Sequence, residues 1–548
     1  MLRWGSDAAL RLLLLVGLSL PLAAKATPPS PAKTCKRAKP ANPYATPVKK
    51  RCARTAPVKA AAKPPAPKKK VKPVEDEDEI ILEDETPTKK KPTTSPVSRL
   101  IRSLFTGHYA TRLSLDFSFD GAQEDIFEWR NRFELTLSHD SGGRFKVYAS
   151  TRFTHWLWLE EAAEPGDLRP TTERAMFLPE LREAYALWRF DFGMELTVGQ
   201  RILSWGRTTF TRPLDVLAPI DLQDGPVTLN GIGRLGVFSV EASQSIGDLN
   251  LSLVWIPFFR PHRVQMFGSD WSMLRPPIKL PIPEEYTSLL GVIHPTRYEE
   301  MQGLLSATED PAQDGFRGAD VGFRFTASFG GLDLGLAYAY QWDKMPMVDI
   351  DADLIQSAML GVIGGDTQSV SALRKAMQIR YERRHVIGAD FSFLVGDFTF
   401  KADVAFFTSH TLYTEDLESL RHPSLSWAFQ IDYMFRKNLI VSLEFSHQAF
   451  FGVASGTKLL FFDENLMRLS GVIEGRFGPQ EMFRLQVGGM VGITQKDAII
   501  TPRFTWRQSG LLSLDLGAVI FLGDDDIVSV GALFKKASYG YASARFSF

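Results

Sequence analysis

The stretch Phe398-Thr-Phe-Lys-Ala-Asp-Val-Ala-Phe-Phe407 alternates between apolar and polar side chains with a period of two. Successive side chains of a β-strand point to opposite faces, so one face of this strand carries phenylalanines while the other carries Lys401 and Asp403. Residues 425–436 and 439–446 repeat the pattern. One aromatic face and one charged face are typical of a strand that lies between lipid and water in the wall of a membrane-spanning barrel.

Similar segments recur along the chain after Gly107. We place strand starts near residues 108, 127, 144, 182, 194, 233, 248, 318, 332, 385, 397, 425, 438, 464, 482, 497, 511 and 538. They predict an all-β fold, a transmembrane antiparallel β-barrel of about 18 strands, within 16 to 20, over residues 107–548. Residues 526–534 fit a further strand, which would make the count odd. A soluble sandwich or propeller fits less well, because we find no internal repeat and the apolar faces carry Phe and Trp.

Short turns alternate with longer loops up to residue 438. The turns are 139–144, 191–194, 329–332, 395–397 and 436–438. With the amino terminus in the periplasm, these turns lie on the periplasmic side and the long loops outside, as in bacterial outer-membrane barrels.

The two ends of the chain point to the Gram-negative outer membrane. Residues 1–26 combine Arg3, a mostly apolar run over 10–22 and the small-x-small site Ala24-Lys-Ala26, and so predict a signal peptide. The apolar run is shorter than the roughly 20 residues that a spanning helix needs. The last strand, which alternates over 538–548, ends in an aromatic residue. Terminal Phe548 resembles the signal read by the barrel assembly machinery, and the resemblance implies that machinery as a partner.

The segment between signal and barrel has the composition of a disordered linker. Residues 27–95 are rich in Lys, Pro and Ala and almost free of aromatic residues, which predicts a solvated periplasmic linker. Alternatively it is a tether that binds cell-wall polymer or a periplasmic protein, with the aliphatic residues 80–82 as the contact. Cys35 and Cys52 are a candidate disulfide in the oxidising periplasm. Residues 96–106 show helical spacing and predict an amphipathic helix.

If the apolar faces meet lipid, the charged faces line the lumen. The predicted lumen-lining charges are Arg130, Arg132, Glu134, Lys146, Arg152, Arg189, Arg324, Lys401, Asp403, Asp432, Glu444, Arg484, Arg503, Arg507, Asp515 and Arg545. Basic residues predominate in this set, which predicts a mild preference for anions. Pairing of these charges across strands to brace the wall is compatible with conduction, and the sequence favours neither role.

One further element stands out between two predicted strands. Gly199-Gln-Arg-Ile-Leu-Ser-Trp-Gly-Arg-Thr-Thr-Phe210 is followed by Pro213-Leu-Asp-Val-Leu-Ala-Pro-Ile-Asp221. We interpret it as a mouth loop, with Trp205 at the outer interface and Gly206 allowing the turn. Candidate solute contacts in this loop are Arg207, Arg212, Asp215 and Asp221.

This element also resembles outer-membrane barrels of the porin-like and alginate-export-like group. Residues 254–259 and 340–346 resemble later elements of the same group. The resemblance implies passage of solutes or polymer across the outer membrane and does not name the cargo.

Two longer loops, 256–318 and 342–385, contain more chain than a simple connection needs. We expect them to fold into the barrel mouth as a constriction, with an external platform for a partner as the alternative.

The leading hypothesis is a non-enzymatic channel for diffusion or export. The alternative is a scaffold barrel whose tail tethers an envelope complex. The nine His are scattered and show no catalytic or metal-ligand spacing, so we expect no enzyme, metal or cofactor. With a formal net charge of zero, we also expect no nucleic-acid partner.

Overall fold

The computed structural model describes residues 104–116, 127–158, 174–222, 225, 233–264, 271, 318–350, 354, 357, 377–415, 418–435, 438–524 and 527–548. The predictions for the signal peptide (1–26), the linker (27–95) and the pair Cys35 and Cys52 lie outside these residues.

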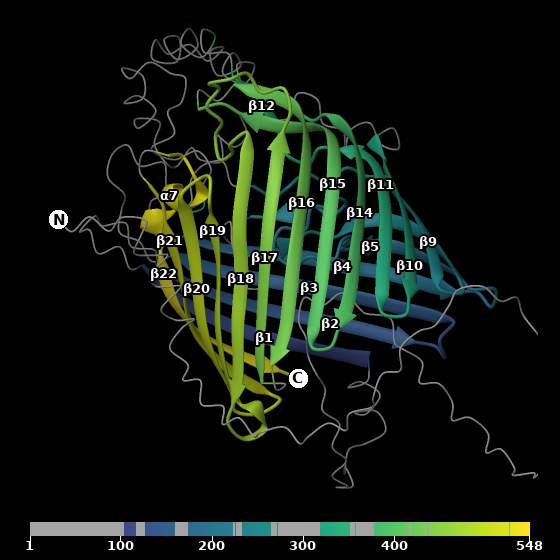
Figure 1. Cartoon of the computed structure of the whole chain (residues 1–548). Coiled ribbons are helices and arrows are strands. Elements are labelled where there is room, and N and C mark those ends of the chain that lie inside the picture. Colours follow the sequence, from purple (N-terminus) through teal and green to yellow (C-terminus); the bar gives the residue numbers. More distant parts are fainter. Residues whose placement is uncertain are drawn as a thin grey trace, which may run out of the picture. The chain divides into compact units, whose positions relative to one another are not determined.

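Eighteen strands form one closed antiparallel sheet, in which each strand pairs with the next and the last pairs with the first (Figure 1). The strands are β1 (Phe105–Asp116), β2 (Phe127–Asp140), β3 (Phe145–Trp158), β4 (Arg174–Arg189), β5 (Met194–Arg201), β8 (Val237–Ile246), β9 (Leu249–Ile256), β10 (Asp320–Phe329), β11 (Leu332–Trp342), β14 (Arg383–Val395), β15 (Phe398–Tyr413), β16 (Ser419–Phe435), β17 (Leu439–Phe450), β18 (Asn465–Phe477), β19 (Phe483–Gly492), β20 (Asp497–Arg507), β21 (Leu512–Leu522) and β22 (Tyr539–Ser547). The prediction of an all-β, 18-stranded antiparallel barrel is confirmed.

Short elements lie outside the barrel wall. They are the hairpins β6 (Ile220–Asp221) with β7 (Gly233–Arg234) and β12 (Met347–Ile350) with β13 (Met377–Arg380), the helix α7 (Val530–Leu533), and the 3₁₀ turns η3 (Pro479–Glu481) and η4 (Lys535–Ala537). The further strand considered over 526–534 is wrong where the chain is described, because α7 occupies this stretch. The Ser529 hydroxyl caps the helix by accepting from the Ala532 N–H. The number of wall strands therefore stays even.

The amphipathic helix predicted over 96–106 is wrong at its last two residues. Phe105 and Thr106 pair with Leu137 and Thr136 as the start of β1. Residues 96–103 lie outside the described part of the chain.

The outer face of the wall is apolar and exposed. Along β15, for example, Phe398, Val404 and Phe406 are among the exposed large apolar side chains, while Asp403 on the other face is buried. The same alternation runs around the ring. A closed sheet satisfies all its ladder hydrogen bonds internally and an apolar outer face suits hydrocarbon, so the fold is that of an outer-membrane β-barrel. Within the described ranges, no helix is long and apolar enough to cross a membrane.

Connections at the two ends of the barrel differ in length. At one end β4 and β5, β10 and β11, and β14 and β15 are joined by turns of a few residues, as predicted. At the other end the connections after β5, β9 and β11 are long. The assignment of the short-turn end to the periplasm stays a prediction.

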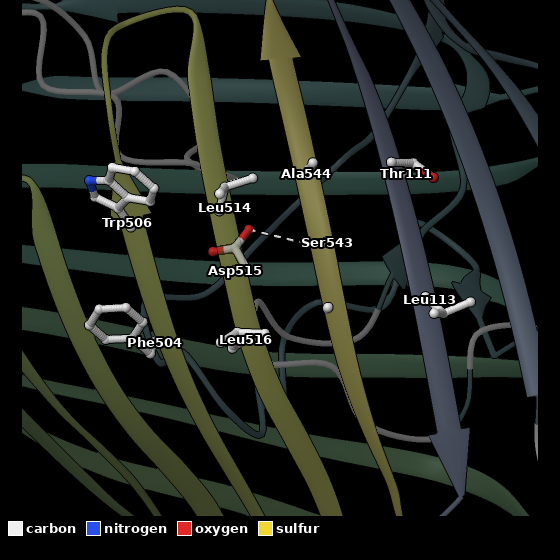
Figure 2. Close-up of a pocket in the computed structure, with 10 residues that line it drawn as sticks. Thr111, Leu113, Phe504, Trp506, Leu514, Asp515, Leu516, Ser543 and Ala544 are labelled. Atoms are coloured by element: carbon white, nitrogen blue, oxygen red, sulfur yellow. Dashed lines mark hydrogen bonds between the residues drawn. The ribbon is translucent and has the colours of Figure 1, made fainter.

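A groove of about 380 Å³ lies on the outer face at the closing seam (Figure 2). It is lined by Ala542 and Ala544 on β22, by Leu514 and Leu516 on β21 next to them, and by Phe504 and Trp506 on β20 beyond. The only hydrogen bond drawn there runs from the Ser543 hydroxyl to the Asp515 carboxylate, 3.3 Å, on the inward face of the same strands. The groove faces lipid and is separate from the interior described next.

Candidate functional site

The connection after β5 turns into the barrel interior. We call residues 202–219 the crossing loop. Its tip reaches side chains on β15, β16 and β17, which lie six to eight strands further round the 18-stranded ring than β5. The contacts that hold the tip there come mainly from backbone amides of the loop and inward side chains of the wall.

Asp403 on β15 binds the first part of the tip. Its Oδ1 accepts the Arg207 N–H at 2.8 Å, and its Oδ2 accepts both the N–H and the hydroxyl of Thr208, at 3.1 and 2.6 Å. Asp403 is only 1% exposed. Hydrogen bonds to an ionised carboxylate are stronger than hydrogen bonds between neutral groups. The Asp403 carboxylate accepts three such bonds at once.

Gln430 and Glu444 bind the rest of the tip. The Gln430 Oε1 accepts the Thr209 N–H at 2.7 Å, and its Nε2 donates to the Thr209 hydroxyl at 3.0 Å. The two oxygens of Glu444 accept the Phe210 and Thr211 N–H groups at 3.0 and 2.8 Å. We call Asp403, Gln430 and Glu444 the anchor residues. Because they sit on three successive strands, they fix the tip along a row of the wall.

The Arg207 side chain adds ion pairs to this attachment. Its Nε lies 2.6 Å from Asp390 and its Nη1 lies 3.2 Å from Asp333. Arg324 on β10 approaches the other oxygen of Asp390 at 2.9 Å. The predicted solute contact Arg207 is therefore engaged by carboxylates of β11 and β14.

Apolar side chains before and after the tip, which we call the two arms of the crossing loop, pack against the wall. Trp205, Leu214 and Leu217 are buried in one cluster with inward residues of β8, β9, β11, β14 and β15. A Cβ at Gly322 on β10 would lie 2.6 Å from the Trp205 ring, so this glycine makes room for it. The interpretation of Trp205 as an outer-interface residue is wrong. The loop turns inward after β5 instead of emerging at the lipid boundary.

Gly206 has a specific role in this geometry. Its φ of 91° is left-handed, as the predicted turn requires, and an added Cβ would lie 2.5 Å from Asp403 Oδ2. We expect Gly206→Ala to push the tip away from Asp403 and to increase single-channel conductance and current noise in planar bilayers. The matched control is Gly475→Ala, since no atom lies within 4 Å of a Cβ there. Identical recordings from the two variants would contradict this assignment.

The returning arm and the base of the crossing loop are held by polar pairs. Asp215 is paired with Arg234 at 2.9 Å, and Arg263 pairs with Asp221 at 3.1 Å. Burial lowers the pKa of His262 to about 3, and its unprotonated Nδ1 accepts the Ile220 N–H at 2.8 Å. The predicted contacts Asp215 and Asp221 are thus part of the loop's own framework.

The strand registers place every predicted lumen-lining charge on the inward face. These are Arg130, Arg132, Glu134, Lys146, Arg152, Arg189, Arg324, Lys401, Asp403, Asp432, Glu444, Arg484, Arg503, Arg507, Asp515 and Arg545. Several pair across strands, such as Arg152 with Glu134 at 3.1 Å and Lys401 with Asp432 at 2.9 Å. Sequence reasoning missed inward acids that take part in such pairs: Glu128, Glu241, Asp333, Asp390 and Glu474.

The inward charges are distributed unevenly around the ring. The acidic wall, which is the inward face of β10 to β17, carries Asp320, Asp333, Asp390, Asp403, Asp432 and Glu444 with Arg324, Arg384 and Lys401. The basic wall, which is the inward face of β18 to β22 and β1 to β3, carries Arg468, Arg476, Arg484, Arg503, Arg507, Arg545, Arg112, Arg130, Arg132, Lys146 and Arg152 with Glu474, Asp497, Asp515, Glu128, Glu134 and Asp140. The crossing loop lies against the acidic wall.

A second inward element lies at the long-loop end. Leu533 and Phe534, within and after α7, pack with Phe521 and Tyr539 of the wall in a buried apolar cluster. Trp271, from the long loop after β9, lies against this cluster with its ring centroid 5.6 Å from that of Phe534. Apart from residues near its two ends and Trp271, that loop lies outside the described residues, and its predicted role as a constriction stays a prediction.

No group of three or more His, Cys, Asp or Glu side chains suited to a metal ion occurs in the described part of the chain.

Comparison with solved structures returns porin barrels at low sequence identity. OccAB3 of Acinetobacter baumannii is 12% identical with a TM-score of 0.43, and the alignment covers 81% of this chain and 99% of that one. OccK5 (OpdH) of Pseudomonas aeruginosa is 11% identical with a TM-score of 0.40, covering 81% and 98%. Salmonella typhi OmpF, in complex with daunomycin, is 9% identical with a TM-score of 0.37, covering 81% and 97%.

No curated protein sequence matches the chain. Residues 170–461 match the family described as "Protein of unknown function (DUF1302)". This range contains the crossing loop and the three stretches that carried the resemblance to porin-like barrels. It spans more than half of the 548 residues, so the chain belongs to the DUF1302 family of unknown function, here with the fold of a porin-like outer-membrane barrel.

Proposed function

We propose that the protein is a passive outer-membrane channel for small hydrophilic solutes, with the crossing loop as its constriction. The observation that carries the proposal is the attachment of the loop tip to the inward side chains of Asp403, Gln430 and Glu444, six to eight strands from its own strand. A segment held inside the lumen narrows the aperture and favours small solutes over a polymer.

The charge distribution supports a preference for anions. On the acidic wall, Asp390 and Asp333 are paired with Arg207, and Asp403 and Glu444 accept backbone amides. The loop thereby engages all four carboxylates, and those of Asp390, Asp403 and Glu444 are buried. The path that remains runs along the basic wall, where Lys and Arg outnumber Asp and Glu. A low-dielectric channel focuses the field of such a wall and attracts anions.

The test is single-channel recording of the purified mature protein in a planar bilayer under a KCl gradient. We expect stable conductance with a reversal potential on the anion side. Permanent silence, in the full protein and in a variant without the crossing loop, would overturn the channel proposal. Conductance with a preference for cations would overturn the proposed anion selectivity but would still support the proposal of a channel.

The same proposal includes assembly through the carboxyl terminus. Phe548 exchanges backbone hydrogen bonds with Gly107 at 2.9 and 3.1 Å, and its side chain is 60% exposed beside Phe133. An exposed terminal aromatic on the outer face is accessible to the barrel assembly machinery. The roles of residues 27–95 as a periplasmic linker and as a tether to an envelope partner remain predictions. Deletion of that segment tests them: loss of partner recruitment with intact conductance would support the tether.

A further inference from the structure

The tip of the crossing loop contains a residue in an unfavourable backbone conformation. Arg212 has a φ of 48°, in the left-handed region that side chains other than glycine, asparagine and aspartate rarely adopt. It also precedes Pro213, which further restricts its backbone. Residues held in such conformations cluster at functional sites, where surrounding contacts fix them. Here the Thr211 N–H is bound by Glu444 on one side, and Leu214 is buried on the other.

Arg212 lies between the tip, which Glu444 binds, and the returning arm, where Asp215 pairs with Arg234, and these four charged groups differ in exposure. The side chains of Asp215 and Glu444 are buried, and that of Arg234 is 9% exposed. The Arg212 side chain is 28% exposed. It donates from Nε to the Thr209 carbonyl at 3.2 Å, and its Nη1 lies 3.6 Å from Asp215, which is closer to Arg234. The most exposed of these four charges is therefore a cation.

We propose that Arg212 is the selectivity-determining residue of the constriction, the guanidinium that a permeating small anion such as chloride or a carboxylate contacts. This inference rests on the proposed channel function. Glycine at this position would keep the amide bonds of its neighbours and relieve the left-handed backbone. The guanidinium makes two contacts within the loop, to the Thr209 carbonyl and to Asp215, and its remaining N–H groups offer a fork of donors to a passing anion.

The test compares Arg212→Gln, Arg212→Gly and Arg212→Lys with wild type in planar bilayers, using KCl and potassium acetate gradients. We expect the anion-to-cation permeability ratio to fall by roughly fivefold in the Gln and Gly variants, the Boltzmann factor of one close charge contact in water. The Lys variant keeps the charge and should keep the wild-type ratio. Arg144→Gln, which removes an exposed charge at a short turn, is the control for net charge.

The outcomes separate the inference from the proposed function. A wild-type ratio in Arg212→Gln, with wild-type conductance intact, overturns the role of Arg212 and leaves the channel. An equal fall in the Lys variant also overturns it, because geometry and not charge would then be responsible. The absence of conductance in wild type overturns both.

Discussion

Replacing Asp403 and Glu444 together by alanine is expected to release the tip of the crossing loop and to raise single-channel conductance several-fold. The two carboxylates accept five donors, namely the N–H groups of Arg207, Thr208, Phe210 and Thr211 and the Thr208 hydroxyl. Each buried donor left without an acceptor costs about 1–3 kcal/mol. Since the lumen offers water as an alternative partner, the loop lowers its free energy by leaving the wall.

The measurement is the amplitude distribution of single-channel currents. The charge-matched control is Asp140→Ala with Asp191→Ala, which removes two carboxylates at the short-turn end, away from the loop. The wall strands should form in both proteins, which heat-dependent mobility on a denaturing gel checks. If the Asp403 and Glu444 variant conducts with the amplitude of this control, the anchor residues do not hold a constriction.

Excising residues 204–217 and joining 203 to 218 with a flexible Gly-Ser linker is expected to have a larger effect. An 18-stranded barrel is wide enough for an aqueous channel when no segment crosses it. Conductance should therefore rise beyond that of the anchor variant. Excision also exposes the carboxylates of Asp333, Asp390, Asp403 and Glu444, so the reversal potential should move towards cations.

A rise in conductance together with a shift of the reversal potential distinguishes the crossing loop from other segments that could limit the aperture. The reversal potential and conductance are measured in the same recordings, with the anchor variant for comparison. Unchanged conductance after excision would show that the limiting aperture lies elsewhere, for example at the apolar cluster of α7 and Trp271. If conductance rises but the reversal potential does not move towards cations, the crossing loop does not mask the carboxylates of the acidic wall.

The barrel could be predicted from sequence because its physical signal is local. Period-two alternation assigns each side chain to lipid or lumen, and a one-residue error would invert a whole strand. The assignments of Lys401 and Asp403 followed directly from the pattern in which they stand. The stretch over 526–534 was misread because a short apolar run does not distinguish a strand from a helical turn.

The attachment of the crossing loop to the wall could not be predicted because its contacts carry no side-chain pattern. The donors are backbone amides of Arg207 to Thr211, which every non-proline residue possesses. Trp205 was misplaced because tryptophan between a strand and a loop is common at membrane interfaces, and only the position of Gly322 on a distant strand reveals its pocket. Gly206 before the mostly polar stretch 207–212 was the one available signal of a sharp turn.

Because the crossing loop is attached mainly through its backbone amides, its attachment to the wall depends little on the identity of its tip side chains. The wall must supply Asp403, Gln430 and Glu444, but the residues that they bind contribute mainly main-chain groups. Side chains at the tip can therefore change during evolution without loss of the aperture. A few codons of this one loop can therefore vary the chemistry of the tip in descendants of one gene, while the wall that holds it is inherited unchanged.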